Sequence, residues 1–376
     1  MVKQVKIDEF IELARHCVVL DVRSEGEYEY AHIPGAYSLP LFSNEERKVV
    51  GTAYKQESRE QAIKIGLDYF GVKMRKMVEQ VEEIVAKSKV EIPNSKIQAQ
   101  GFGSYQNGIP FPITNSKSPI PILVHCWRGG MRSAGVAWLL DLYGFEVCTL
   151  AGGYKSFRNW VLGRFEQPYS FKVLGGYTGS GKTEVLRQLR EEKQAVVDLE
   201  GIAQHKGSAF GALGQPEQPT QEMFENKLAL QLHVVAQGAA KEPVWIEDES
   251  SRIGSVNLPI EFWKTMRQSP VFFLDIPFEE RLHFIVKGYG SFEKKELIAS
   301  VIRIRKRLGS ANAKDAVNHI LDGNIKEAFA ILLRYYDKYY AGGMQERENR
   351  LTIIPCDNVN EQANIKKLLS EQTIAG

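Results

Sequence analysis

A glycine-rich segment that follows an apolar stretch constrains the fold of this chain more than any other feature. In Gly176–Thr183, two glycines separated by four residues are followed by Lys and Thr. The apolar stretch before it, Phe171–Leu174, predicts a strand, and the pattern after it predicts a helix to about Arg190. Backbone N–H groups of such loops surround phosphate oxygens where a strand of a parallel sheet meets a helix. The sequence therefore predicts an α/β domain that binds a phosphorylated ligand.

The side chains of this P-loop have expected roles in binding the ligand. Lys182 places a positive charge on the terminal phosphates, and the hydroxyl of Thr183 can hold Mg²⁺. The residues expected to bind a diphosphate are Gly176, Thr178, Gly179, Ser180, Gly181, Lys182 and Thr183. The motif indicates a polyphosphate without selecting ATP, because a diphosphate on a lipid or prenyl group satisfies the same loop.

A carboxylate that completes the Mg²⁺ site is expected at the end of a neighbouring strand. An acidic cluster, Glu247–Glu249, follows one apolar strand, and we expect one of its carboxylates, first Glu247 or Asp248, to share the ion with Thr183. The pattern does not decide which carboxylate points inward. Asp198 and Glu200 follow another predicted strand and remain alternatives, and such a cluster is equally often only solvated.

The length of the chain indicates two domains. Its 376 residues exceed what one compact core usually holds. We expect two α/β domains, residues 1–165 and 166–376, with parallel sheets covered by helices on both faces. In the first we expect one long helix, Glu60–Lys87, and an insertion around residues 88–120 that is rich in Pro, Gly, Ser and Asn. The second is expected to end in a helical part, with a basic helical subdomain around residues 281–342.

Charge and cysteine content exclude several classes of protein. The net charge is +2, from 48 Lys+Arg and 46 Asp+Glu, so any surface for nucleic acid must be local. The four cysteines form no C-x-x-C pair, which argues against a zinc site or a disulfide framework and favours reduced thiols. We see neither a signal peptide nor a run approaching the roughly 18 apolar residues of a membrane span, so we expect a cytoplasmic protein.

A cysteine at the junction of a strand and a helix is the second candidate site. Cys126 ends an apolar stretch, and the unsatisfied N–H groups at the start of the predicted helix attract an anion. Arg128 and Arg132 add positive charge, which favours thiolate over thiol. We therefore expect Cys126, Arg128 and Arg132 to be catalytic rather than structural. The other residues expected to line the loop are Trp127, Gly129, Gly130, Met131 and Ser133.

The cysteine loop and its flanking motifs resemble those of rhodanese-like domains, which carry sulfur or selenium on the cysteine. The matching segments occur in the same order: Asp21–Arg23, His32–Ala36, the cysteine loop and Leu150–Gly153. The loop also resembles that of cysteine-dependent phosphatases, since it reads His-Cys-x-x-Gly-x-x-Arg-Ser and is one residue longer than in common rhodaneses. A wider loop suits a tetrahedral oxyanion. A selenophosphate donor fits both resemblances, because it has the shape of phosphate and delivers a chalcogen.

A basic segment in the second half of the chain is a candidate RNA surface. Residues 281–307 contain eight Lys or Arg and two Glu. Basic groups neutralise phosphates, so these residues would contact RNA or the P-loop ligand. The alternative is a solvated charged face. The candidate contacts are Arg281, Arg303, Lys306 and Arg307, of which the last three share one predicted helix face.

The two loops together resemble the tRNA 2-selenouridine synthases along nearly the whole chain. Further matching segments are Asp198–Glu200, His205–Gly211 and Glu247–Ser250. The resemblance implies a rhodanese-like parallel-sheet domain followed by a P-loop NTPase-like doubly wound α/β domain with a helical C-terminal part. It also implies a transferase that replaces sulfur by selenium in wobble 2-thiouridine of tRNA, in the anticodon region.

The resemblance further implies the co-substrates of that reaction. Geranyl diphosphate would first alkylate the sulfur, and selenophosphate would then supply the selenium, with Mg²⁺ at the P-loop. Two interpretations of other classes stay open. One is a cysteine-dependent phosphatase or sulfurtransferase fused to a P-loop kinase, and the other is a sulfur-carrier module that the P-loop only regulates.

Overall fold

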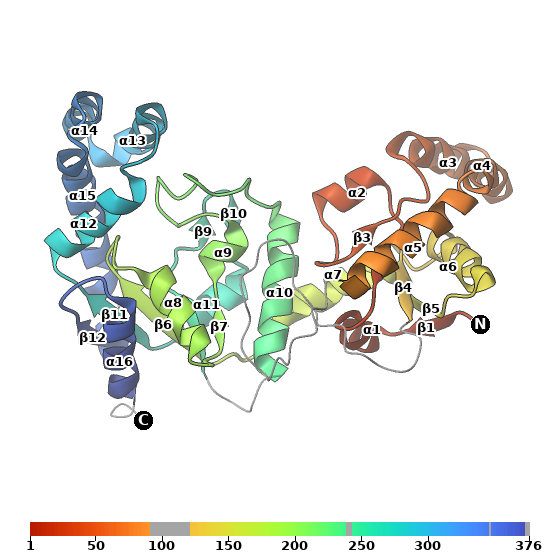
Figure 1. Cartoon of the computed structure of the whole chain (residues 1–376), viewed down its shortest axis with the longest axis horizontal. Helices are drawn as coiled ribbons and strands as arrows, with labels where there is room; N and C mark the ends of the chain where they lie inside the picture. Colours follow the sequence, from red (N-terminus) through yellow and green to blue (C-terminus); the bar gives the residue numbers. More distant parts are fainter. Residues whose placement is uncertain (91–120, 238–242, 346, 373–376) are drawn as a thin grey trace. The chain divides into compact units, whose positions relative to one another are not determined.

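The chain folds into two compact units that meet in sequence between Arg164 and Phe165. The computed structural model describes residues 1–90, 121–237, 243–345 and 347–372. Each unit contains a five-stranded, all-parallel sheet with helices on both faces (Figure 1). The expected fold class is confirmed. None of the described helices combines the length and the apolar character that crossing a membrane requires.

The first unit is built on a sheet with the strand order β1-β5-β4-β2-β3. Its strands are β1 (Lys3–Val5), β2 (Val19–Asp21), β3 (Tyr37–Ser38), β4 (Ile122–His125) and β5 (Val147–Leu150). Its helices are α1 (Ile7–Ala14), α2 (Glu25–Tyr30), α3 (Asn44–Gln56), α4 (Arg59–Gly71), α5 (Met74–Val90), α6 (Met131–Tyr143) and α7 (Gly153–Arg164). Helices α5 and α6 enclose one apolar core against the sheet, and α1 and α7 pack together on the other face.

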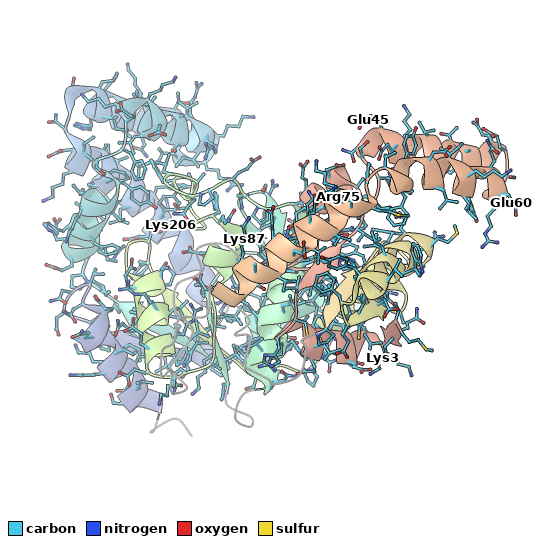
Figure 2. The ribbon with its side chains drawn as sticks, turned by 45° about the vertical axis from the view of Figure 1, so that its right-hand side comes forward. Lys3, Glu45, Glu60, Arg75, Lys87 and Lys206 are labelled. Atoms are coloured by element: carbon cyan, nitrogen blue, oxygen red, sulfur yellow. The ribbon has the colours of Figure 1, made fainter. Side chains whose placement is uncertain are left out.

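The predicted long helix, Glu60–Lys87, is wrong, because the chain forms α4 and α5 with a turn between them. The N–H of Lys73 donates to the carbonyl oxygen of Phe70 at 2.9 Å, which closes the turn after Gly71. The turn lets buried side chains of both helices face the core, while Arg75 and Lys87 of α5 remain exposed (Figure 2). Helix α5 also extends into the start of the expected insertion, whose residues 91–120 lie outside the described part.

The second unit is built on a sheet with the strand order β12-β11-β6-β8-β7. These strands are β6 (Phe171–Gly176), β7 (Val196–Val197), β8 (Val244–Glu247), β11 (Val271–Asp275) and β12 (Leu351–Pro355), and β9 (Arg252–Ile253) pairs with β10 (Val256–Asn257). Helices α8 (Lys182–Glu191) and α16 (Glu361–Gln372) pack on one face. On the other face lies α11 (Ile260–Gln268), where the ring of Phe262 is 5.2 Å from that of Phe171.

The expected helical part is present and has its own apolar core. It consists of α12 (Phe278–Tyr289), α13 (Lys294–Leu308), α14 (Ser310–Asp322) and α15 (Ile325–Gln345), and the remaining helices of the unit are α9 (Leu199–Ala203), α10 (Gln221–Gln237) and η1 (Glu348–Arg350). Phe210, from the segment between α9 and α10, inserts into this core beside Phe329. The helical part is thereby joined to the loops at the carboxyl ends of the sheet strands.

Candidate functional sites

The cysteine loop connects β4 to α6 and places a thiol against a serine hydroxyl. Cys126 is buried, with 3% of its surface exposed, and its Sγ lies 3.2 Å from Oγ of Ser133. Burial alone would raise the pKa of this thiol. The hydrogen bonds from Ser133 and the charge of Arg132 outweigh burial, so the pKa of Cys126 lies below its ordinary value. The loop therefore favours a thiolate nucleophile.

The backbone of the loop is held by the start of α7. The N–H of Tyr154 donates to the carbonyl oxygen of Cys126 at 2.8 Å, and that of Lys155 donates to Trp127 at 3.0 Å. Close approach of the two segments requires glycine. Gly129 has a φ of +64°, and a Cβ there would lie 2.5 Å from the carbonyl oxygen of Leu150. The position of the sulfur is thus fixed by main-chain contacts on both sides.

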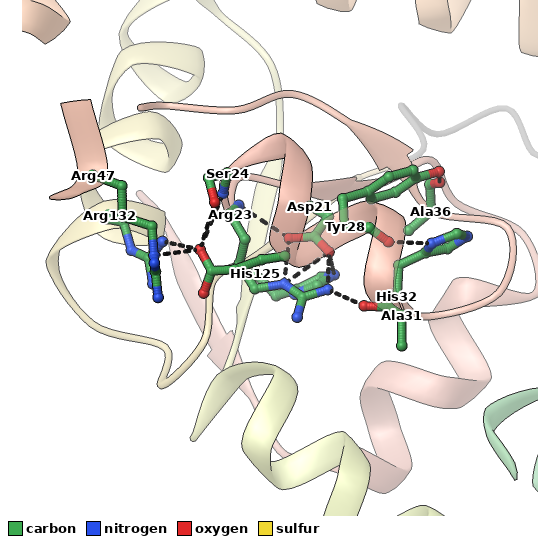
Figure 3. A network of polar contacts seen from close by, with 11 residues as sticks. Asp21, Arg23, Ser24, Tyr28, Ala31, His32, Ala36, Arg47, His125 and Arg132 are labelled. Carbon is green, nitrogen blue, oxygen red and sulfur yellow. Dashed lines mark hydrogen bonds and ion pairs between the residues drawn. The ribbon is translucent and has the colours of Figure 1, made fainter. Parts of the chain in front are cut away.

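Arg132 is fixed by a carboxylate from a different part of the sequence. Its Nη1 lies 3.0 Å from Oε2 of Glu27, and Nε of Arg47 lies 2.9 Å from the same oxygen (Figure 3). Glu27 also accepts a hydrogen bond from the N–H of Ser24, within a capping box at the start of α2. Although burial opposes it, the charge of Arg132 lowers the pKa of Glu27. Arg132 is held beside the loop in one orientation.

The remaining predicted loop residues reach solvent. Arg128 and Gly130 are exposed, and the exposed fractions of Trp127 and Met131 are 37% and 53%. The cysteine loop therefore presents cationic and apolar side chains to solvent beside a buried sulfur. This arrangement suits an anionic reactant that enters from solvent.

A buried group of polar residues, Asp21, Arg23 and His125, lies beside the cysteine loop. Asp21 and Arg23 are at most 1% exposed and form an ion pair of 2.6 Å (Figure 3). The guanidinium also lies 3.8 Å from the ring centre of Tyr154. Burial lowers the pKa of His125, whose Nε2 is 3.8 Å from Asp21, and so favours the neutral ring. These residues position the strand ends that carry Cys126.

The P-loop has the strand–loop–helix context that the sequence predicts. It leaves β6 at Gly176 and enters α8 at Lys182, whose Nζ donates to the carbonyl oxygen of Gly176 at 3.0 Å. Gly179 has a φ of +82°, and a Cβ there would lie 2.6 Å from Ile285 of α12. Ser180 is 1% exposed, and among the described residues its hydroxyl has no hydrogen-bond partner. A buried hydroxyl of this kind is suited to a phosphate oxygen.

Two carboxylates lie beside the P-loop. The hydroxyl of Thr183 donates to Oε2 of Glu200 at 3.2 Å. Gly207 brings Glu249 to the same place, because a Cβ on this glycine would lie 2.7 Å from Oε1 of Glu249 and 3.1 Å from Oε1 of Glu200. Burial raises the pKa of both carboxyls, and Lys182 opposes the shift. The pKa of Glu249 is raised further by the charge of Glu200, whereas that of Glu200 is raised further by Asp198 and lowered by its contact with Glu249. Like charges held together in this way favour a bound cation.

These donors fit Mg²⁺, which keeps several waters and uses only one or two protein carboxylates beside phosphate oxygens. The residues that would hold it are Thr183, Glu200 and Glu249. Across the described residues, no cluster of three or more His, Cys, Asp or Glu side chains is arranged to hold a metal by itself. The site therefore suits an ion that arrives with a phosphorylated ligand.

Helix α13 has a strongly basic exposed face. It carries six Lys or Arg and one Glu, and Arg303, Lys306 and Arg307 are all exposed. In the described part of the chain, the side chains of Lys295, Arg305 and Lys306 form no hydrogen bond or ion pair. Alternating charges are typical of a merely solvated helix, whereas this face has almost one sign.

The basic face is joined to the P-loop region by direct contacts. Nη1 of Arg303 donates to the carbonyl oxygen of Ala209 at 3.0 Å, two residues after Gly207. The hydroxyl of Tyr336 accepts from the N–H of Ala209 at 3.2 Å. Lys206, labelled in Figure 2, lies 5.6 Å from the ring centre of Tyr289. A polyanion on α13 would therefore lie near the P-loop carboxylates.

Comparison with known proteins gives matches in both units and over most of the chain. Residues 169–373 match the model of the tRNA 2-selenouridine synthase AAA domain, and residues 7–68 match that of the rhodanese-like domain. The chain is 30% identical to the tRNA 2-selenouridine synthase of Nitrosomonas eutropha, over 93% of each chain. The chain belongs to the tRNA 2-selenouridine synthase family. Within this family, the enzyme of Pseudomonas syringae pv. syringae is 32% identical, with 89% of this chain and 90% of that one covered. The enzyme of Hydrogenovibrio crunogenus is 30% identical, with 94% and 95% covered.

In this member of the tRNA 2-selenouridine synthase family, two expected site residues have other partners. Asp248 is paired with Arg347, whose Nη1 lies 2.5 Å from its Oδ1. Glu247 is fully buried and accepts a hydrogen bond from the N–H of Leu199 at 2.8 Å. Glu247 therefore positions the segment that carries Glu200. Of the carboxylates beside the P-loop, the sequence offered Glu200 as an alternative and Glu249 as one of three undecided members of the acidic cluster.

Arg281 also has a different position from the one expected. It is 3% exposed and forms paired hydrogen bonds with Asp337 at 2.9 and 2.7 Å, so it is not a surface contact for RNA. Its Nη1 also donates to the carbonyl oxygen of Thr178 at 3.1 Å. In this tRNA 2-selenouridine synthase relative, Arg281 therefore braces the P-loop. Sequence reasoning missed Glu27, although the capping pattern Ser24-x-x-Glu27 marks it as the first turn of a helix.

Proposed function

We propose that this chain replaces sulfur by selenium in 2-thiouridine of tRNA through an S-geranylated intermediate. Membership of the family supports tRNA as the substrate. The observation that carries the proposal is the presence of two anion-binding loops of different chemistry in one chain. The P-loop carries the ammonium group of Lys182 and lies beside two carboxylates, whereas the cysteine loop carries a thiol of lowered pKa. We assign one step to each domain, residues 166–376 and 1–165.

The first step uses geranyl diphosphate at the P-loop. The thione sulfur of the base attacks C1 of the geranyl group, the C1–O bond breaks, and diphosphate leaves with the electron pair. The base then loses its N3 proton, which gives a neutral S-geranyl nucleoside. Lys182, the loop N–H groups and the Ser180 hydroxyl neutralise the leaving diphosphate. Mg²⁺ held by Thr183, Glu200 and Glu249 would supply further positive charge there.

The second step uses selenophosphate at the cysteine loop. The P–Se bond breaks and water takes the phosphoryl group as inorganic phosphate. The selenium adds to C2 of the geranylated base, and the C2–S bond breaks with release of geranyl thiol, which takes a proton from solvent. Alkylation makes this release favourable, because a thiolate leaves more readily than the sulfur of a thiocarbonyl. Arg132, Arg128 and the N–H groups at the start of α6 would neutralise the phosphate. Cys126 would act on the donor.

The basic face of α13 is the proposed binding surface for the tRNA backbone. Lys295, Arg305 and Lys306 are exposed cations without a protein partner among the described residues, and Arg303 joins the face to the P-loop region. Contacts with phosphate position a nucleic acid without reading its sequence. We therefore propose that α13 holds the tRNA while the modified base reaches the P-loop.

The test is mass spectrometry of nucleosides from 2-thiouridine tRNA after incubation with the purified protein. Geranyl diphosphate alone should give the S-geranyl nucleoside, and both donors should give 2-selenouridine. Lys182→Ala should lose the first product. Cys126→Ala should keep the first product and accumulate it when both donors are present, so each variant is the control for the other. Unchanged nucleosides, with turnover of phosphate monoesters, would instead support a cysteine-dependent phosphatase fused to a kinase.

A further inference from the structure

We propose that Cys126 attacks the phosphorus atom of selenophosphate, forming S-phosphocysteine and releasing hydroselenide as the nucleophile for the base. This inference rests on the proposed function for the identity of the donor. It assigns to the loop a phosphoryl-transfer activity that needs no tRNA. The bond that forms is Sγ–P, the bond that breaks is P–Se, and selenium leaves with the electron pair.

The electron count distinguishes this step from attack on selenium. If Sγ attacked selenium, the P–Se electrons would stay on phosphorus, so the products would be a perselenide on the cysteine and phosphite. Selenium in a perselenide is too oxidised for direct addition to C2, and a reductant would have to restore it. Attack on phosphorus leaves every oxidation state unchanged and yields selenium in the state that the product requires.

The cysteine loop has the shape and charge that attack on phosphorus requires. Five residues separate Cys126 from Arg132, and the loop enters a helix N-terminus, whose N–H groups favour a tetrahedral anion. Glu27 fixes the guanidinium of Arg132 at 3.0 Å. The main-chain hydrogen bond from Tyr154 fixes the residue that carries the sulfur. A planar, oriented guanidinium is suited to two oxygens of one phosphoryl group.

Ser133 supplies the group that lets the sulfur leave again. Its hydroxyl has a single proton and lies within reach of two acceptors, Sγ of Cys126 at 3.2 Å and the carbonyl oxygen of Gly130 at 3.1 Å. When the sulfur is phosphorylated, the hydroxyl can donate to Gly130. When water attacks the phosphorus and the Sγ–P bond breaks, the electron pair returns to Sγ, and the hydroxyl can turn to stabilise the thiolate. Inorganic phosphate is the second product.

Because hydroselenide is the leaving group, the reaction needs no general acid. An alkoxide leaving group needs a general acid to protonate it, as in cysteine-dependent phosphatases. Hydroselenide is a much weaker base than an alkoxide and departs as an anion. A loop that holds a thiolate and binds the phosphoryl oxygens is therefore sufficient for the first half of the reaction.

The experiment incubates the full-length protein with selenophosphate in the absence of tRNA. Phosphorus NMR of the denatured protein reports S-phosphocysteine, and peptide mapping locates it. Phosphorus NMR is needed because a phosphoryl group and a selenium atom add nearly the same mass. The expected result is phosphorus on Cys126, together with hydroselenide and inorganic phosphate in solution. Cys126→Ser is the control and should release no hydroselenide.

The Ser133→Ala variant makes the test sharper. Loss of a hydrogen bond to a charged group should slow hydrolysis of the phosphocysteine by about tenfold to a hundredfold, so the adduct should accumulate. Ser133→Thr keeps the hydroxyl and should restore hydrolysis. Normal geranylation by the same preparation would show that the second unit is intact.

Two results would overturn the inference. Phosphite in solution with selenium on Cys126 would place the chemistry at selenium. An absence of phosphocysteine in both the wild type and Ser133→Ala, with 2-selenouridine still formed from tRNA, would refute this step while leaving the proposed function intact. Failure of the proposed function would look different, because tRNA would then remain unmodified whatever happens to selenophosphate.

Discussion

The hydroxyl of Thr183 and the carboxylate of Glu200 are joined by a hydrogen bond of 3.2 Å, although 17 positions separate them in the sequence. The bond places a carboxylate beside the P-loop hydroxyl that binds Mg²⁺ in proteins of this kind. Glu249 is brought to the same place around Gly207. The ion that accompanies a diphosphate would therefore be bound between the end of β8 and the start of α9.

Replacing Glu200 should affect geranyl transfer through Mg²⁺. For Glu200→Gln we expect a higher Mg²⁺ concentration at half-maximal rate. The rise should be at least roughly 10–100-fold, which is the cost of losing even a residue that only supports a metal ligand. Asp248→Asn is the matched control, because Asp248 binds Arg347 and should leave the Mg²⁺ requirement unchanged. Titration of the geranylation rate with Mg²⁺ measures both. Equal curves for the two variants would contradict this placement of the ion.

The buried carboxylates predict a dependence of stability on pH. Burial and neighbouring carboxylates raise the pKa of Glu249 and Glu247 above the ordinary 4.5. Above that value the folded protein holds more protons than the unfolded chain, so their contribution to stability is lost as pH rises through the folded pKa. When thermal unfolding is measured from about pH 5 to about pH 8, the melting temperature of Glu249→Gln should rise relative to that of the wild type as pH rises.

Titration of His125 does not affect the comparison of stability between the wild type and Glu249→Gln. Burial lowers its pKa, so its contribution is present above the unfolded pKa and is lost as pH falls, which is the opposite sign. The wild type and Glu249→Gln share this contribution, and it cancels in their difference. Addition of diphosphate and Mg²⁺ should reduce the difference in stability between the wild type and Glu249→Gln, because Mg²⁺ neutralises the carboxylates. Melting temperatures of the two proteins that differ by the same amount at every pH would argue against a raised pKa of Glu249.

Two adjacent glycines of the cysteine loop should differ in their tolerance of alanine. Gly129→Ala places a Cβ 2.5 Å from a backbone oxygen at a φ of +64°, so it should cost more than the roughly 1–2 kcal/mol of a left-handed residue alone. Gly130→Ala meets nothing within 4 Å and should behave like the wild type. The rate of selenation and the rate of alkylation of Cys126 measure whether the cysteine loop keeps its geometry. Equal loss in both variants would show that the backbone contacts do not set the geometry.

Removal of the cations on α13 should weaken tRNA binding and make it less sensitive to salt. For the triple variant Lys295→Ala, Arg305→Ala and Lys306→Ala, we expect about tenfold weaker binding at moderate ionic strength and a salt slope reduced by roughly 2. Charge-preserving exchange of Lys and Arg at the same positions should restore both. Binding curves at several salt concentrations provide the measurement.

The control for this triple variant lies elsewhere in the same unit. Lys264→Ala with Lys366→Ala removes exposed cations from α11 and α16 and should leave binding unchanged. If the α13 variant bound tRNA with the affinity and salt dependence of the wild type and geranylated normally, α13 would be excluded as the tRNA-binding surface. The assignment of the two chemical steps would not be affected.

Local patterns predicted both sheets and both loops, because apolar strands followed by glycine-rich turns are encoded in short stretches. The choice among carboxylates could not be predicted in this way. Asp248 and Glu249 are neighbours in sequence, yet one binds Arg347 and the other lies beside Gly207. That difference depends on segments that meet only in the folded chain. The same holds for Arg281, whose burial depends on Asp337, 56 positions away.

The break between α4 and α5 shows a second limit. The apolar spacing runs from Phe70 to Met74 and Met77 across the turn, so periodicity alone indicated one helix. A glycine at position 71 was the local signal for an end, but glycine also occurs within helices, as Gly66 does in α4. The structure ends α4 at Gly71 with the main-chain hydrogen bond from Lys73 to Phe70, and α4 packs against α3, a contact that the sequence does not show.

The two hydrogen bonds between α7 and the cysteine loop have a consequence for local unfolding. The amide protons of Tyr154 and Lys155 are protected from exchange with solvent only while the carbonyl groups of Cys126 and Trp127 remain in place. Loosening the last helix of the first unit would therefore release the residue that carries the nucleophile. Hydrogen exchange at these two amides reports how often the cysteine loop opens, without a label on the sulfur itself.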